Sequence, residues 1–161
     1  MSFFSLNYSY SYKIVEKNDF PEEVNTIWQQ FSKKIKIGVE RDKKYLDWRY
    51  IQKPYEKYKI VHCYSSNNVY LGFIIYAIKE KHGGKIAYIM ELLFDLKVPK
   101  SGKVLLNYAI KMIKKENADC ILSWCFDHSP NYTVYKKSFF ISLFGKATMN
   151  LASEVMLYAL S

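Results

Sequence analysis

The sequence predicts a single α/β domain, residues 1–161, in which a mixed, mostly antiparallel central sheet is flanked by helices. Three observations lead to this prediction. The chain has 161 residues and half of them are hydrophobic, as expected for one domain with its own core. Short stretches of alternating or continuously apolar residues, typical of strands, recur along the chain. Stretches with apolar residues at helical spacing lie between them, and this order favours a mixed sheet.

The first part of the chain predicts one strand and two helices. Residues 8–17 alternate aromatic with small or polar side chains, which indicates a strand. A capping side chain, a proline and two acids follow at residues 18–23, as at a helix start. Apolar residues then recur at helical spacing: Val24, Ile27, Trp28 and Phe31. Residues 42–51 indicate a second, shorter helix, which ends before Pro54.

Three consecutive strands are expected next, at residues 58–64, 69–79 and 85–96. A polar turn separates the first two, and the glycine pair Gly83-Gly84 suits a hairpin between the last two. The strand at residues 85–96 is apolar on both faces at its centre, so it should lie inside the sheet.

The last part of the chain alternates helices and strands. The clearest helix has an apolar face that includes Leu105 and Met112, and an opposite face rich in lysine. The expected elements are a loop at residues 99–102, a helix at 103–117, a buried strand at 119–126, a helix at 130–138, and strands at 139–144 and 154–160. No internal repeat or interdomain linker interrupts this order.

Charge and composition limit the classes of protein. The formal net charge is +9, from 24 Lys and Arg against 15 Asp and Glu, and such a surface attracts anions. The lysines are scattered, which favours a solvated surface over a nucleic-acid face. No apolar run reaches the roughly 18 residues of a membrane span, and the N-terminal residues lack the features of a secretory signal. We therefore expect a soluble, cytoplasmic protein without a membrane partner, whose three cysteines are thiols.

The order of elements resembles the GNAT (Gcn5-related N-acetyltransferase) fold over nearly the whole chain. One supporting segment is Tyr45-Leu-Asp-Trp-Arg-Tyr50, with Pro54 after it. A second is the strand at residues 86–96, which leads through Lys97-Val-Pro-Lys-Ser-Gly-Lys103 into a helix. A third is Tyr135-Lys-Lys-Ser-Phe-Phe140, which is similar to the family pattern Tyr-x-x-x-Gly-Phe but has Phe139 in the place of the glycine.

The resemblance implies an acyl-CoA-dependent N-acyltransferase that moves an acetyl group from acetyl-CoA to an amine of a small molecule or peptide. It places Glu91 as the general base and Tyr135 as the acid that protonates the leaving thiolate. No metal is implied. The residues that it implies for the cofactor, most of them at a helix N-terminus suited to a pyrophosphate, are Leu92, Leu93, Lys97, Ser101, Gly102, Lys103 and Asn131.

The residues leave alternatives open. Glu91 could pair with a nearby Lys or Arg for structure, and Tyr135 could serve packing. Lys100 stands where the family's phosphate loop has a glycine, and Pro99 lacks an N–H. These departures favour a second hypothesis, a catalytically degenerate module that binds a partner. A third is an aminoacyl-tRNA-dependent transferase, for which nucleic acid would be the partner of the basic surface. Neither the acceptor nor the oligomeric state follows from the sequence.

Overall fold

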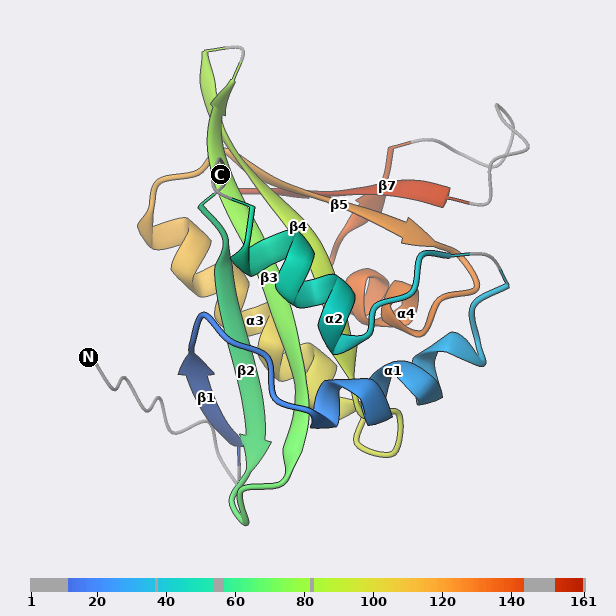
Figure 1. Cartoon of the computed structure of the whole chain (residues 1–161). Coiled ribbons are helices and arrows are strands. Elements are labelled where there is room, and N and C mark those ends of the chain that lie inside the picture. The colour runs from blue at the N-terminus through green and yellow to red at the C-terminus, as the bar shows by residue number, and fades with distance from the viewer. Residues whose placement is uncertain (1–11, 37, 54–56, 82, 144–152, 161) are drawn as a thin grey trace.

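The computed structural model describes residues 12–36, 38–53, 57–81, 83–143 and 153–160. Within these ranges, seven strands form one sheet in the order β1-β2-β3-β4-β5-β7-β6 (Figure 1). The strands are β1 (Tyr12–Glu16), β2 (Lys59–Ser65), β3 (Tyr70–Lys81), β4 (Gly84–Phe94), β5 (Cys120–Phe126), β6 (Ile141–Ser142) and β7 (Ser153–Ala159). Only β4 and β5 of these neighbours run parallel. The predicted class, α/β with a mixed and mostly antiparallel sheet, is confirmed.

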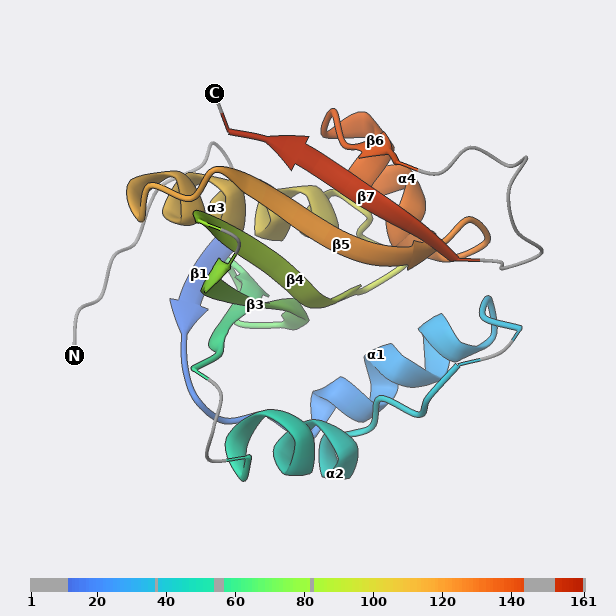
Figure 2. The ribbon, with the colours of Figure 1, turned by 90° about the horizontal axis from the view of Figure 1, so that it is seen from above.

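Helices cover both faces of the sheet. They are α1 (Glu23–Ser32), α2 (Lys43–Leu46), the π-helical turn η1 (Asp47–Ile51), α3 (Lys100–Lys115) and α4 (Pro130–Lys137). Figure 2 shows α1 and α2 on one side of the sheet and α3 and α4 on the other. The four apolar residues predicted for the first helix are all buried under α1, so that prediction is confirmed. In the part of the chain that the structure describes, no helix is long and apolar enough to span a bilayer.

Helix α3 begins earlier than predicted. The expected loop at residues 99–102 is in fact its first turn, because the Ser101 amide donates to the Val98 carbonyl at 2.9 Å. Pro99 is compatible with this start, since the first helical N–H groups have no partner within a helix. Gly102 is required by packing, because a Cβ there would lie 2.6 Å from a ring carbon of Phe94.

Strand β6 is shorter than predicted, with two residues in place of residues 139–144. Residues 8–11 of the first predicted strand, Pro54 and residue 144 lie outside the described residues. All three cysteines are described and none forms a disulfide; Cys63 and Cys125 are buried, while Cys120 is half-buried.

A glycine-type cap ends α4, and Phe139 occupies its central position. The Phe139 amide donates to the Lys136 carbonyl at 3.2 Å, and the Phe140 amide donates to the Tyr135 carbonyl at 3.1 Å. These two bonds define a Schellman motif, in which the residue at the position of Phe139 is usually glycine. Phe139 has the left-handed φ of 67° that the motif requires, and the residue is 84% exposed. Phe139 therefore takes the cap position that glycine usually occupies.

Candidate active site

Strands β4 and β5 separate after a short paired stretch. Residues Ile86–Ile89 of β4 pair with Cys120–Ser123 of β5, and the pairing ends there. Met90 is an extra residue in the β3–β4 ladder, because Glu91 pairs with Ile75 and Ile89 pairs with Tyr76. Such a bulge bends a strand and increases its twist. A wedge therefore opens between the last residues of β4 and β5.

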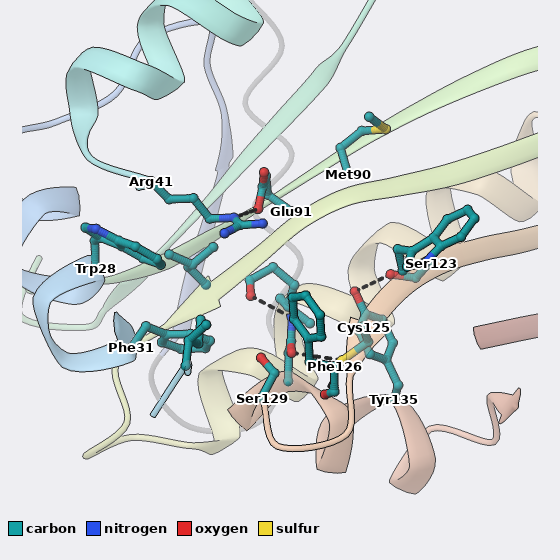
Figure 3. A pocket seen from close by; sticks show the side chains of 15 residues that line it. Trp28, Phe31, Arg41, Met90, Glu91, Ser123, Cys125, Phe126, Ser129 and Tyr135 are labelled. Atoms are coloured by element: carbon teal, nitrogen blue, oxygen red, sulfur yellow. Dashed lines mark hydrogen bonds and ion pairs between the residues drawn. The ribbon is translucent and has the colours of Figure 1, made fainter. Parts of the chain in front are cut away.

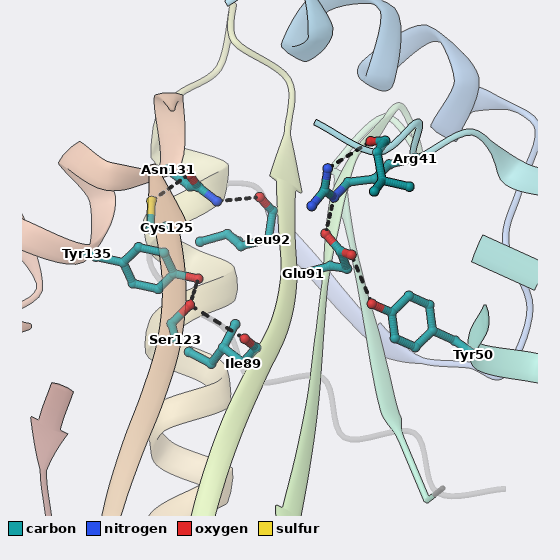
Figure 4. A network of polar contacts seen from close by, with 10 residues as sticks. Arg41, Tyr50, Ile89, Glu91, Leu92, Ser123, Cys125, Asn131 and Tyr135 are labelled. Atoms are coloured by element: carbon teal, nitrogen blue, oxygen red, sulfur yellow. Dashed lines mark hydrogen bonds and ion pairs between the residues drawn. The ribbon is translucent and has the colours of Figure 1, made fainter. Parts of the chain in front are cut away.

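A cavity of about 250 Å³ lies at this wedge and has two walls of different chemistry (Figure 3). Arg41 and Glu91 lie on the side of α1, near Trp28 and Phe31. We call Arg41, Glu91 and the adjoining Tyr50 the charged wall. The neutral wall lies on the side of α4 and comprises Ser123, Cys125, Asn131 and Tyr135, which Figure 4 labels.

An ion pair forms the centre of the charged wall. The Arg41 Nε donates to the Glu91 Oε2 at 2.5 Å, and the Tyr50 hydroxyl donates to the Glu91 Oε1 at 2.9 Å (Figure 4). The Glu91 side chain is 7% exposed and that of Arg41 is 25% exposed. Glu91 is therefore paired with a basic residue, as the structural interpretation of the sequence expected. It also lines the cavity, where a general base would have to lie.

The electrostatics of the charged wall follow from burial. Burial raises the pKa of Glu91 above that of an ordinary carboxyl group, while the charge of Arg41 and the hydrogen bond from Tyr50 limit the rise. Burial alone would lower the pKa of Arg41, but the Glu91 carboxylate more than compensates and the pKa is raised. Burial, followed by the Glu91 charge, also raises the pKa of Tyr50, so its hydroxyl stays a donor.

The neutral wall joins β5 to α4 through hydroxyl groups. The Ser123 Oγ donates to the Tyr135 hydroxyl at 2.8 Å, and it lies 3.5 Å from the Ile89 carbonyl of β4 (Figure 4). Tyr135 is 1% exposed, and burial is the main cause that raises its pKa. Its hydroxyl therefore stays protonated across the physiological range.

Asn131 bridges the two strands across the wedge. Its Nδ2 donates to the Leu92 carbonyl at 3.4 Å, and its Oδ1 accepts from the Cys125 thiol at 3.1 Å. The Leu92 peptide group consequently faces the wedge. Leu92, Leu93 and Asn131 all line the cavity, as does Tyr135, so the structure brings these four predicted residues together with Glu91.

The other predicted cofactor residues lie apart from this cavity, around the start of α3. Lys97 and Lys103 are exposed. The Ser101 side chain is fully buried, and its hydroxyl donates to the Val98 carbonyl at 2.7 Å. Gly102 is buried against Phe94. None of the four is among the described residues that line the cavity at the wedge.

Sequence reasoning missed several lining residues. Trp28 and Phe31 were expected only as core. The sequence does distinguish Arg41 in one respect, because it is one of just two arginines among 24 Lys and Arg residues. It lies 50 residues from Glu91 in the sequence, so no local spacing connects them. Ser123 and Cys125 alternate on a buried strand, a pattern that indicates one shared face without indicating a cavity.

The chain is similar to known proteins in its fold. No family model and no curated protein matches its sequence. Solved structures do match. An acetyltransferase of the GNAT family from Staphylococcus aureus superposes with a TM-score of 0.65 at 16% identity, over 93% of this chain and 99% of that one. An acetyltransferase from Streptococcus agalactiae gives a TM-score of 0.67 at 14% identity, over 92% and 98% of the two chains.

A third match includes the cofactor. The PaiA N-acetyltransferase from Thermoplasma acidophilum, solved in complex with coenzyme A, has a TM-score of 0.63 at 17% identity, over 91% of this chain and 99% of that one. The chain therefore has the GNAT fold, and the resemblance predicted from the sequence is confirmed at the level of the fold.

Proposed function

We propose that residues 1–161 form a single acyltransferase domain that transfers an acyl group, most simply acetyl, from CoA to an amine. The observation that supports this most is the wedge between β4 and β5, where Glu91, Leu92 and Tyr135 converge on one cavity. A GNAT-fold structure solved with coenzyme A adds support. The acceptor would be a small-molecule or peptide amine, and the location would be the cytoplasm, where acyl-CoA is available.

In the proposed reaction, Glu91 of the charged wall accepts a proton and Tyr135 of the neutral wall donates one. The ammonium of the acceptor loses a proton to Glu91, directly or through water, and the resulting amine attacks the thioester carbonyl. The new N–C bond forms and the C–S bond breaks. Tyr135 gives its proton to the leaving thiolate and regains one as the nitrogen loses its second proton. Glu91 returns its proton to solvent, so the products are an amide, CoA thiol and one released proton.

The surroundings of Glu91 suit its role as the base. A carboxylate whose pKa is raised by burial is a better base toward an ammonium group than an exposed one. Ser123 donates to the Tyr135 oxygen, so the Tyr135 proton can be directed to another acceptor. The Leu92 amide, on the same edge of β4 as the carbonyl that Asn131 holds, would donate to the thioester oxygen as charge develops there.

Groups along β4 and at the start of α3 are suited to bind the pantetheine arm and the pyrophosphate of an acyl-CoA. Beyond Ile89, the edge of β4 that faces the wedge offers backbone groups to the amides of a pantetheine arm. The N-terminus of α3, a helix of 16 residues, would attract the pyrophosphate, with Lys97 and Lys103 adding positive charge. The inward hydroxyl of Ser101 leaves only its backbone for such a contact.

Calorimetric titration with acetyl-CoA, and with CoA as the control, tests this proposal. We expect micromolar binding that weakens about tenfold in a Lys97→Gln, Lys103→Gln double variant, since each lysine contributes a charge contact to phosphate. Lys115→Gln, at the opposite end of α3, is the matched control and should bind as the wild type does. No binding at millimolar ligand would reject acyl transfer and favour the degenerate partner-binding module.

A further inference from the structure

Arg41 stands out among the charged residues because its guanidinium is only partly used. Its Nε binds Glu91 and its Nη1 donates to the Val39 carbonyl at 2.9 Å. Its Nη2 has no hydrogen-bond partner among the described residues, and Arg41 is part of the cavity lining. A guanidinium with unused donors in a cavity is suited to a carboxylate, which it binds through two parallel hydrogen bonds.

Glu91 offers the opposite charge at the same point of the cavity. Each of its oxygens accepts one hydrogen bond from the described residues, Oε2 from Arg41 and Oε1 from Tyr50. A carboxylate has about four lone-pair sites, so room remains for an ammonium group. Figure 3 shows the two side chains next to each other on one side of the cavity. A ligand with adjacent positive and negative groups can therefore contact both.

The net charge of a ligand decides how well it can bind beside the buried Arg41–Glu91 pair. The Arg41–Glu91 pair is neutral as a unit and mostly buried. A simple amine cation or a simple carboxylate would add an uncompensated charge to this environment, which is costly. A zwitterion adds none. The apolar surface beside the pair, formed by Trp28, Phe31 and Ile35, would receive an apolar side chain.

We propose that the acceptor is a free α-amino acid with an apolar side chain, whose ammonium binds Glu91 and whose carboxylate binds Arg41. The identity of the reaction rests on the proposed function, but the recognition of the zwitterion does not. In this arrangement the amine lies against the base, and Arg41 acts in binding rather than in chemistry.

The test uses three probes that share one phenyl group. L-Phenylalanine carries both charges, phenethylamine lacks the carboxylate and 3-phenylpropionate lacks the amine. Titrations of each into the wild-type protein, without acyl-CoA, should show the amino acid binding about 10- to 100-fold more tightly than either analogue. Equal or tighter binding of phenethylamine would overturn the proposal.

A pair of variants identifies the residue responsible. Arg41→Lys keeps the charge that Glu91 needs but loses the planar fork, so the preference for phenylalanine over phenethylamine should fall about tenfold. Arg49→Lys is the matched control, because the other arginine of the chain stacks on Tyr50 outside the cavity lining. An unchanged preference in Arg41→Lys, with the fold verified by circular dichroism, would also overturn the proposal.

The two proposals fail separately. Discrimination among the three probes without any binding of acetyl-CoA would keep the amino-acid site and reject acyl transfer. Binding of acetyl-CoA, with acetylation of phenethylamine at least as efficient as that of phenylalanine, would keep acyl transfer and reject the amino-acid acceptor.

Discussion

The charged wall and the neutral wall of the cavity are built differently. In the charged wall, Glu91 is held by partners 50 and 41 residues away in the sequence, and the contacts depend on charge. In the neutral wall, the contacts run through hydroxyl, amide and thiol groups. Tyr135 and Asn131 are bonded to residues 12 and 6 positions away, and Asn131 also donates to the Leu92 carbonyl, 39 positions away. Because only the charged wall contains buried charges, it should carry the larger energies. The neutral wall should tolerate change better.

Glu91→Gln should have the largest effect, and it acts on activity. We expect turnover to fall by about 10²- to 10⁴-fold, because glutamine cannot accept the proton of the amine. Its amide oxygen can still accept from Arg41, and its NH2 group can donate to the Tyr50 hydroxyl oxygen, so the melting temperature should change by less than about 4 °C. Glu80→Gln, at the exposed end of β3, is the control. A large drop in stability with activity retained would make the ion pair purely structural.

Arg41→Met should have the next largest effect, on stability. Glu91 would be left buried without its counterion, and the loss should be about 3 kcal/mol near pH 8. The missing charge would raise the folded-state pKa of Glu91 further above its unfolded value. A group with a raised folded pKa contributes stability at low pH that is lost as the pH rises, so the deficit should be smaller at pH 5.

Urea unfolding at both pH values measures this dependence on pH, with Lys44→Met, which removes an exposed cation of α2, as the control. A deficit that is equal at pH 5 and pH 8 would show that Glu91 does not titrate in the variant.

Tyr135→Phe probes the neutral wall and should lower turnover and stability less than the two changes in the charged wall. We expect turnover to fall about tenfold, below the usual range for acid–base catalysis because a thiolate leaves readily without full protonation. Stability should fall by about 1 kcal/mol, since Ser123 loses one partner. Tyr132→Phe, on the same helix, is the control. Unchanged turnover in Tyr135→Phe at every pH would remove Tyr135 from the chemistry.

Phe139→Gly should have the smallest effect and the opposite sign. A left-handed backbone costs a non-glycine residue about 1–2 kcal/mol, so glycine at this cap should stabilise the fold by about 1 kcal/mol. Phe139→Ala separates the backbone from the exposed ring, because alanine keeps the Cβ and should gain nothing. Thermal melting of the two variants gives the result, and equal melting temperatures would exclude backbone strain.

The local features of the fold could be predicted from the sequence, because each has a local cause. The buried face of α1 follows from helical spacing, and the buried strand of Glu91 follows from its apolar neighbours on both faces. The resemblance to the GNAT family predicted Tyr135 and Asn131 as site residues on one helix, and both line the cavity.

The rest depends on contacts that a linear pattern does not contain. Arg41 lies between α1 and α2 and meets Glu91 only when the chain has folded. Ser101 and Gly102 matched a loop pattern, yet their side-chain positions face the Val98 carbonyl and the Phe94 ring. The pattern identified the start of α3 without revealing which of its groups point inward.

The four residue pairs that join β4 to β5 make a narrow seam between two larger pieces of sheet. A linear ligand lying in the wedge would extend that seam, as an added strand would, and would belong to the folded state as much as to the reaction. Ligand at about 100 times its dissociation constant stabilises a protein by about 2.7 kcal/mol. The melting temperature of the protein should then rise with the concentration of that ligand, which thermal melting across a ligand series would measure.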